Sequence, residues 1–321
     1  MNRRLRKLIP AALILLVVGA LIMVAALFSM KFDFRRLSTR KTVTSTHAPT
    51  GDFDDILISV DTADVVFLPS EDGKLKVVCV EEEGCEHIVS TLSGKLSIQA
   101  VDTRRWYEKA GVGGEETSVT VYLPKKEYGS LTLRTSTGDV EIPASFRFAS
   151  VLMSGSTADI HLQADAEGSI SIQTSTGSIT LTGLQAASLD LQASTGQITV
   201  SESVISGAVE ARASTGKISF TDLNCAEARV KTSTGDASFD FVLASESIRA
   251  ETGTGDVRFQ RSDALDIFVK TDTGDVTGTL LTTKLFEADT DTGKVKLPVS
   301  GPGGRCRLES DTGDFNISLV G

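Results

Sequence analysis

Three Asp-Thr-Gly tripeptides are the residues of this chain whose type and spacing best suit catalysis, and they occupy residues 272–274, 291–293 and 311–313. Aspartic proteases place a catalytic carboxylate with the same tripeptide, but they need two such loops face to face, so that the carboxylates share a proton. Here the tripeptides recur at the repeat period described below, which predicts a single row and no facing pair. We therefore expect no catalytic residues.

A cation site is the alternative chemistry for the same carboxylates. Asp272, Asp291 and Asp311 are predicted to stack on one face, and carboxylate oxygens are ligands that Ca²⁺ prefers. The simpler interpretation is a solvated row of turn carboxylates, because a nearby lysine, Lys294, relieves their repulsion. The three aspartates stay weak metal candidates, and we expect no metal and no cofactor.

A second candidate site is the sequence RRWY, formed by Arg104, Arg105, Trp106 and Tyr107, which contains the only tryptophan of the chain. It lies in the longest irregular segment. The segment could bind a partner, or it could be a hydrophobic lid over the first coil of the repeat, as the end of a solenoid requires. We favour the lid and keep the four residues as binding candidates.

The histidines and cysteines do not form a recognisable metal motif. His47, His87 and His161 are far apart in sequence, and no cysteine or carboxylate stands at a zinc-ligand spacing from them. Cys79 and Cys85 could close a small disulfide loop in an oxidising compartment, or they could remain reduced, partly buried thiols.

A corner of the type Ser-Thr-Gly returns every 19 or 20 residues through the second half of the chain. A short fixed period is typical of a solenoid, in which each repeat buries its apolar face only against its neighbours. A threonine precedes the corner position in all ten repeats. The corner positions are Gly138, Ala158, Gly177, Gly196, Gly216, Gly235, Gly255, Gly274, Gly293 and Gly313.

Two apolar columns flank each corner and alternate with polar residues, which predicts two one-sided strands per repeat. A repeat of this length has no room for a helix as well. The fold class is therefore all-β, a parallel β-solenoid of about ten coils, each lying on the preceding one. We expect positive φ at the corner glycines, negative φ at Ala158, a hydrogen-bonded threonine ladder along the corners and a core position for Cys306.

A span of 23 residues without charge, from Leu8 to Met30, precedes the repeat. As a helix it would measure about 34 Å, enough to cross a bilayer. We interpret it as an uncleaved transmembrane helix, with a cleaved signal peptide as the alternative. Residues 1–41 carry a net charge of +8, which favours contact with anionic lipid headgroups. The remaining residues carry a net charge of −18, which argues against nucleic-acid binding because the phosphates are also negative.

These features divide the chain into four parts. We assign residues 1–30 to a cytoplasmic tail and transmembrane helix, 31–43 to a basic juxtamembrane linker, 44–130 to an irregular β cap and 131–321 to the regular β-solenoid. Within the cap, residues 60–69 match the corner pattern with Ala63 in the glycine position. We expect the body of the protein outside the cytoplasm, because large domains are exported largely regardless of charge.

The features that carry a family resemblance are the N-terminal anchor, the cap that ends in VTVYLP and the repeated corners TSTGDVEI and TDTGDVTG. Through these features, residues 50–321 resemble the bacterial putative-adhesin family. The resemblance implies a β-solenoid domain of unknown function at the cell envelope, with relatives associated with envelope stress responses. It supplies no catalytic residues.

Three functions remain open from the sequence. The first is a membrane-anchored, non-enzymatic, adhesin-like module that binds an envelope protein or polysaccharide and contacts lipid through its helix. The second is a β-helix carbohydrate-active enzyme that uses the stacked aspartates. The third is a bactofilin-like polymerising scaffold, because an uncapped last coil permits end-to-end self-association.

Overall fold

The computed structural model describes residues 16, 18–19, 41–105 and 116–320. Among these residues it shows no helix that is both long and apolar enough to cross a membrane. Most of the predicted transmembrane helix and most of the basic linker lie outside the described residues, and so do Trp106 and Tyr107.

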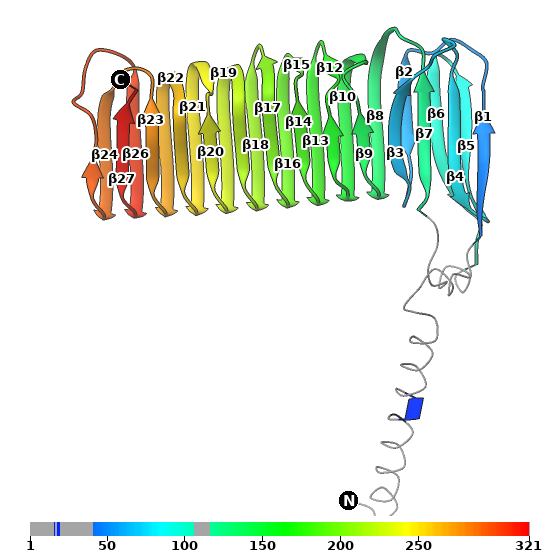
Figure 1. Cartoon of the computed structure of the whole chain (residues 1–321), viewed down its shortest axis with the longest axis horizontal. Coiled ribbons are helices and arrows are strands. Elements are labelled where there is room, and N and C mark those ends of the chain that lie inside the picture. The colour runs from blue at the N-terminus through cyan, green and yellow to red at the C-terminus, as the bar shows by residue number, and fades with distance from the viewer. Residues whose placement is uncertain (1–15, 17, 20–40, 106–115, 321) are drawn as a thin grey trace, which may run out of the picture.

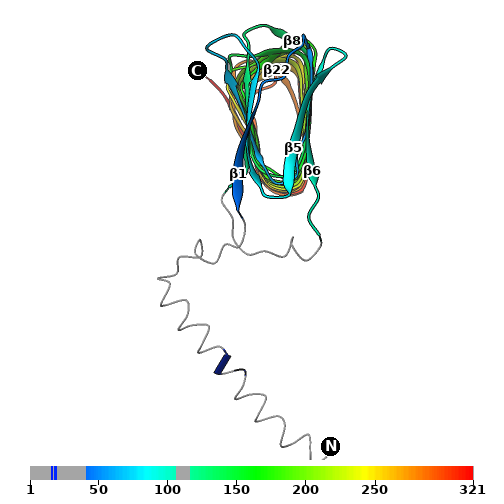
Figure 2. The same cartoon turned by 90° about the vertical axis from the view of Figure 1, so that its right-hand side faces the viewer.

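The described part of the chain holds 27 β-strands joined in one continuous hydrogen-bonded sheet. The sheet is wound into a rod (Figure 1), and the view from its end shows two facing walls, with the coils superposed in projection (Figure 2). The predicted all-β parallel solenoid is thereby confirmed. We call the edge with the ten corner positions the corner edge, and the other edge of the rod the opposite edge.

Strands that run toward the corner edge form the first wall. In spatial order they are β6 (Lys95–Asp102), β2 (Asp55–Ser59), β8 (Glu127–Thr137), β10 (Arg147–Thr157), β13 (Ser169–Thr176), β16 (Ser188–Thr195), β18 (Ala208–Thr215), the ends of β19 (Ile218–Thr234), β21 (Leu243–Thr254) and β22 (Val257–Thr273), then β26 (Arg305–Thr312) and β24 (Leu285–Thr292).

Strands that leave the corner edge form the second wall. In spatial order they are β7 (Ser118–Leu123), β3 (Asp64–Pro69), β9 (Val140–Ile142), β11 (Ile160–Leu162), β14 (Ile179–Thr182), β17 (Ile198–Ile205), the start of β19, β20 (Ala237–Asp240), the start of β22, β23 (Val276–Leu280), β27 (Phe315–Leu319) and β25 (Val295–Lys296). Two short strands, β12 (Asp165–Ala166) and β15 (Gln185–Ala186), pair with their neighbours along the opposite edge.

Three antiparallel strands cap the end of the rod that comes first in sequence. They are β1 (Thr42–His47), β4 (Lys76–Glu82) and β5 (Cys85–Leu92). Strand β4 lies between β1 and β7 and continues the second wall, whereas β5 pairs with β6 and continues the first wall. Strands β4 and β5 reverse direction relative to the coils, whereas β1, antiparallel to β4, again runs in the direction of β7. Within the range 44–130 that the sequence assigned to an irregular cap, only these three strands are irregular, because β2–β3 and β6–β7 form in-register parallel coils.

The space between the walls is filled by the predicted apolar columns. Every second residue of the wall strands points inward, and these side chains form one continuous buried cluster along the rod. Phe220, Phe239 and Phe259 occupy the same place in consecutive coils, with ring centroids 5.8 Å and 5.1 Å apart. Cys306 is only 1% exposed, which confirms its predicted core position.

The corners stack in register along a single line. The threonines before the corner pair with one another from coil to coil, all ten of them. Seven corner glycines, from Gly138 to Gly274, have φ between 126° and 154°, whereas the last two do not share this conformation; Ala158 has no positive φ, as predicted. A Cβ atom at Gly216 would lie only 1.9 Å from the carbonyl oxygen of Gly196, so consecutive corners touch backbone to backbone.

The side chains that form hydrogen bonds at the corner are not the ones that the sequence predicted. The threonine directly before the corner is exposed, and among the described residues it forms no side-chain hydrogen bond. The threonine two residues earlier does: Thr174 Oγ1 donates to the carbonyl of Thr176 at 3.0 Å. The aspartate after the corner also contributes, since Asp159 Oδ1 accepts the N–H of Ser178 in the next coil at 2.6 Å.

The expectation that each coil lies on the preceding one is wrong at both ends of the rod. The last coil, β26–β27, lies between β22–β23 and β24–β25, and near the other end β2–β3 lies between β6–β7 and β8–β9. The last coil buries Cys306, Leu308 and Phe315, whereas Ala288 and Val295 of β24–β25 stay exposed. Inserting the more apolar coil therefore buries more apolar surface.

This coil order predicts which corner residues can be cross-linked. Neighbouring parallel strands lie about 4.8 Å apart, and disulfides need Cα atoms about 4.4–6.8 Å apart. We expect the pair Thr273→Cys and Thr312→Cys to form a disulfide on mild oxidation. The matched pair Thr273→Cys and Thr292→Cys spans two coils and should remain reduced, as measured by peptide mass spectrometry. The reverse pattern would contradict the inserted coil.

Candidate interaction surface

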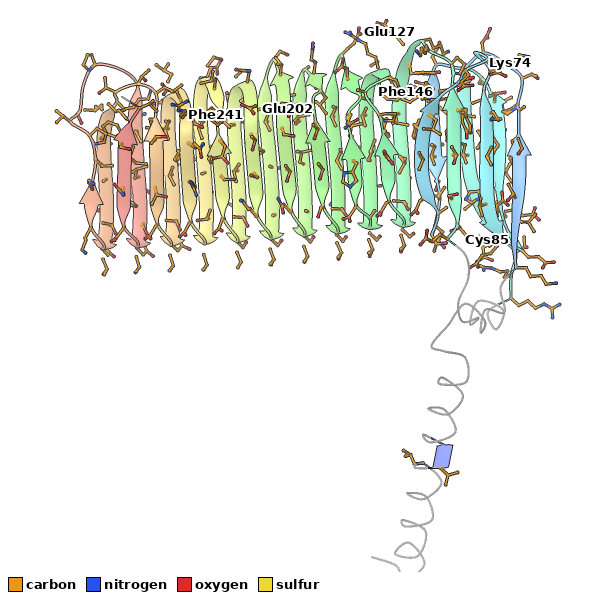
Figure 3. The ribbon with its side chains drawn as sticks, viewed as in Figure 1. Lys74, Cys85, Glu127, Phe146, Glu202 and Phe241 are labelled. Atoms are coloured by element: carbon orange, nitrogen blue, oxygen red, sulfur yellow. The ribbon has the colours of Figure 1, made fainter. Side chains whose placement is uncertain are left out.

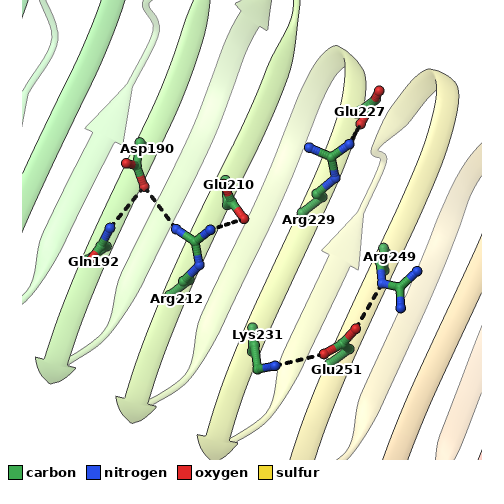
Figure 4. Close-up of polar contacts among 9 residues, drawn as sticks. All are labelled: Asp190, Gln192, Glu210, Arg212, Glu227, Arg229, Lys231, Arg249 and Glu251. Carbon is green, nitrogen blue, oxygen red and sulfur yellow. Dashed lines mark hydrogen bonds and ion pairs between the residues drawn. The ribbon is translucent and has the colours of Figure 1, made fainter.

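The outer side of the first wall carries a network of ion pairs over four consecutive coils (Figure 4). The Arg212 guanidinium lies between Glu210 and Asp190, with 3.3 Å from Nη1 to Asp190 Oδ1. Two coils farther on, Glu251 accepts from Lys231 at 3.0 Å and from Arg249 at 2.9 Å. Because positive and negative side chains alternate on this outer face, their charges neutralise one another.

The hydrogen bonds from Lys231, followed by those from Arg249, lower the pKa of Glu251 below its ordinary value. A shallow depression of about 270 Å³ lies among these side chains, with Arg229 paired to Glu227 at its border. Solvent-exposed ion pairs contribute less than about 1 kcal/mol each. The cations of this face are therefore engaged with their own carboxylates, which makes the face a poor site for a free anion.

An apolar groove lies at the opposite edge, toward the end of the rod formed by β24 and β25. Its volume is about 780 Å³, within the size range of ligand sites. Its floor is a ladder of small side chains, Cys225, Ala244 and Ala264, which lie in register across β19, β21 and β22. Figure 3 shows the same edge of the rod, where Glu202 and Phe241 are labelled.

Exposed leucines border this groove. Leu243 and Leu265 line it and are 45% and 64% exposed, and Leu281, next to the lining residue Thr282, is 41% exposed. Large apolar side chains gathered at one place on a surface indicate an interaction site more strongly than scattered ones. The groove is open to solvent on one side, so a ligand that fills it would still leave these leucines partly in water.

The far wall of the groove is the glycine-rich connection between β25 and β26. A Cβ atom at Gly304 would lie 1.5 Å from the carbonyl oxygen of Leu265, and one at Gly303 would lie 2.1 Å from that of Thr283. These two positions therefore require glycine, because the wall packs backbone against backbone. Two backbone hydrogen bonds fix the wall, from Leu285 N to Gly304 O at 2.8 Å and from Gly301 N to Lys284 O at 3.1 Å.

A buried ion pair lies within the groove. Lys284 is 3% exposed, and its Nζ lies 2.6 Å from Asp263 Oδ1 and 2.7 Å from Thr282 Oγ1. Burial raises the pKa of the Cys225 thiol to about 12, so this groove thiol stays protonated and is not a nucleophile at neutral pH. The groove therefore offers apolar contact area and one neutralised polar pair, and is suited to binding.

The predicted aspartates lie in a row on the corner edge, in the spatial order Asp272, Asp311, Asp291, and all three are exposed. They do not appear among the His, Cys, Asp and Glu groups whose ligand atoms converge in the part of the chain described here. Asp275 and Asp314, farther along, accept backbone N–H groups of neighbouring coils at 2.7 Å. The three aspartates are therefore solvent-exposed turn residues of the corner edge, whereas the groove lies at the opposite edge.

Of the RRWY segment, the structure describes only the two arginines. The Arg104 guanidinium pairs with Asp102 at 2.9 Å and with Glu82, and its side chain is 17% exposed. Arg104 therefore ties β6 to β4 at the cap. Arg105 is exposed, and the two aromatic residues of the segment lie outside the described residues.

The groove was missed in the sequence because its parts come from irregular positions of four coils. The available signal was the run SGPGG at residues 300–304, which breaks the repeat. The end coil β24–β25 is exposed on its outer side, with Leu285 52% and Val295 49% exposed, and end-to-end self-association stays a prediction.

Comparison with known proteins supports the fold. The family model of the Toastrack DUF4097 domain matches residues 53–242 and 203–321. A crystal structure of a putative adhesin from Parabacteroides distasonis is similar at a TM-score of 0.51 and 13% identity, covering 85% of this chain and 98% of its own. A putative lipid binding protein from the same species has a TM-score of 0.50 at 15% identity, covering 88% and 98%. No curated protein matches the chain.

The buried pair predicts a large effect of one substitution. Lys284→Met leaves the largely buried Asp263 carboxylate without its cation, and breaking a buried pair in this way costs about 3 kcal/mol or more. We expect a corresponding loss of unfolding free energy in urea titration. The control Lys294→Met, at an exposed lysine, should change it by less than about 0.5 kcal/mol. Equal stability of the two variants would contradict the role of the pair.

Proposed function

Because the chain belongs to the Toastrack DUF4097 family, we propose that it is a membrane-anchored, non-enzymatic, adhesin-like interaction module of the bacterial cell envelope. The observation that supports this proposal is the open apolar groove with its exposed leucine border at one end of a rigid rod. The β-solenoid supplies a stiff support, because the long strands of both walls, between the two ends of the rod, are hydrogen-bonded on both sides.

We propose that the groove binds a partner protein that presents apolar side chains. A lipid acyl chain is the alternative, and one similar structure is described as a putative lipid binding protein. An acyl chain gains most from full enclosure, but this groove is open and its bordering leucines remain 41–64% exposed. A flat apolar protein surface could cover the groove and the leucines together, and would remove more apolar area from water.

The position of the groove agrees with anchoring at the N-terminus. Strand β1, the first strand of the described chain, lies at the cap end of the rod, and the groove lies toward the other end (Figure 1). An anchor formed by residues 8–30 would therefore hold the cap end at the membrane and leave the groove end farther along the rod. We extend the proposal to envelope stress, because the family resemblance implies that setting.

Membrane orientation is the first test. A phosphatase that is active only outside the cytoplasm, fused after Gly321, should be active in intact cells, because the proposal places the body outside. The same fusion to a variant in which Ile14, Leu15 and Val17 are all changed to Arg should lose membrane association, since each charge disfavours insertion by about 2.5–3.5 kcal/mol. An inactive phosphatase in the unmodified fusion would contradict the envelope proposal.

The groove is tested by photo-crosslinking in living cells. A photoreactive amino acid at position 265 should give a discrete protein adduct on a denaturing gel, because Leu265 borders the groove. The matched control is position 152, since Leu152 is similarly exposed, at 49%, but lies on β10, several coils away. The adduct at 265 should fall at least tenfold when Leu243→Asp is added. Equal adducts at both positions, or adducts with lipid alone, would overturn the proposal.

A further inference from the structure

The cap contains a second cluster of polar side chains at the other end of the rod from the groove. Ser45 and His47 on β1 face Cys79 and Glu81 on β4, because the two strands pair antiparallel with Ser45 opposite Cys79. His87 approaches from β5 on the other wall, and its backbone N–H donates to Glu81 Oε2 at 3.2 Å. Three strands that are separate in sequence thus contribute to one polar site inside the rod.

The ligand atoms of His47, Cys79 and Glu81 all lie within 4.8 Å of one another, and this is the only such group among the described residues. Tetrahedral zinc has bonds of about 2.0–2.3 Å, which separates neighbouring ligand atoms by about 3.3–3.7 Å. His87 Nδ1 lies 3.6 Å from Glu81 Oε1, a separation that fits two ligands of one ion. His87 is not part of the group within 4.8 Å, so coordination by all four residues requires the His87 ring to move closer to at least one of the other three ligands.

An independent observation concerns His87. It is 6% exposed, and neither of its ring nitrogens has a hydrogen-bond partner. Buried polar atoms without a partner are rare, since each loses its hydration without compensation. A metal ion bound to one of these nitrogens would satisfy it, because neutral imidazole is a common metal ligand.

The site is too enclosed for a larger ligand. Cys79 is 0% and Glu81 5% exposed, and the adjoining cavity, which Glu81, His87 and Cys85 line, holds only about 10 Å³. That volume is about the size of one water molecule or one ion. The mixture of one thiol, two imidazoles and one carboxylate is typical of zinc-type ions, whereas Ca²⁺ and Mg²⁺ select oxygen ligands.

From this geometry we propose that His47, Cys79, Glu81 and His87 bind one divalent transition-metal ion of the zinc type, which fastens β1, β4 and β5 to each other. Ser45 is a positioning residue: its Oγ donates to Glu81 Oε1 at 2.7 Å and lies 3.1 Å from His47 Nε2. The ion would fix the strand that directly follows the N-terminal segment to the rod. The site is independent of the groove and of the partner proposed for it.

Metal binding is accompanied by the loss of one proton. The Cys79 thiol is fully buried, and its sulfur coordinates as thiolate once its proton has passed to solvent, with no change of oxidation state.

The test uses the full chain, purified in detergent and freed of metal with a chelator. Titration with Co²⁺ should saturate at one ion per chain and give a thiolate-to-cobalt charge-transfer band, which Zn²⁺ then abolishes. Saturation with Zn²⁺ should raise the melting temperature by roughly 5–10 °C, since it binds only the folded state. Substoichiometric binding, or a spectrum without the thiolate band, would overturn the proposal.

Four variants separate the site from adventitious binding. Cys79→Ser should abolish the charge-transfer band. His87→Gln should weaken Co²⁺ binding by more than about tenfold, because removing a residue that binds the metal directly costs more affinity than removing a residue that only supports a ligand. The matched controls Cys306→Ala and His161→Gln lie outside the cap and should keep the band and the affinity. A band that survives in Cys79→Ser, or disappears in Cys306→Ala, would contradict the assigned ligands. Circular dichroism verifies the folding of each variant.

Discussion

In-register contact between the backbones of neighbouring corners is the constraint on which the rest of the solenoid depends. From Gly177 to Gly313, an added Cβ atom at a corner glycine would lie 1.9–2.2 Å from a carbonyl oxygen of an adjoining coil. Side chains never approach atoms that closely, so space requires glycine at all these corners, and the positive φ requires it as well up to Gly274. Once the corners are in contact, the strand spacing sets the distance between coils, and the inward residues of both walls must meet across the core.

The same constraint explains why the two edges of the rod have different characters. At the corner edge, threonine and aspartate side chains satisfy the turn backbone, and their identity is fixed by this requirement. At the opposite edge, Glu202, Asp222, Phe241 and Arg261 adopt positive φ at equivalent places in four consecutive coils, although none is glycine. Side-chain identity is freer there, so the groove could arise at this edge without disturbing the stacking.

The sequence predicted the solenoid, the register of its ten threonines and the core position of Cys306, because all three follow from one period. It did not predict the order of the end coils, since a coil inserted between two others makes the same register contacts as one in sequence. Nor did it predict the cluster of His47, Cys79, Glu81 and His87, which forms only because β1, β4 and β5 fold back against the coils. The groove depends on irregular residues for the same reason.

The two ends of the rod solve one problem by different means. A stack of coils exposes apolar residues and unpaired strand edges at both ends. At the cap end, antiparallel strands cover the stack, and polar side chains can enter the interior because no further coil has to pack on them. At the other end, the last coil in sequence is placed inside the stack, so the strand at the chain's C-terminus is paired on both sides. Opening the rod at that end must therefore begin with the less apolar coil β24–β25, while the C-terminal strands remain held between their neighbours.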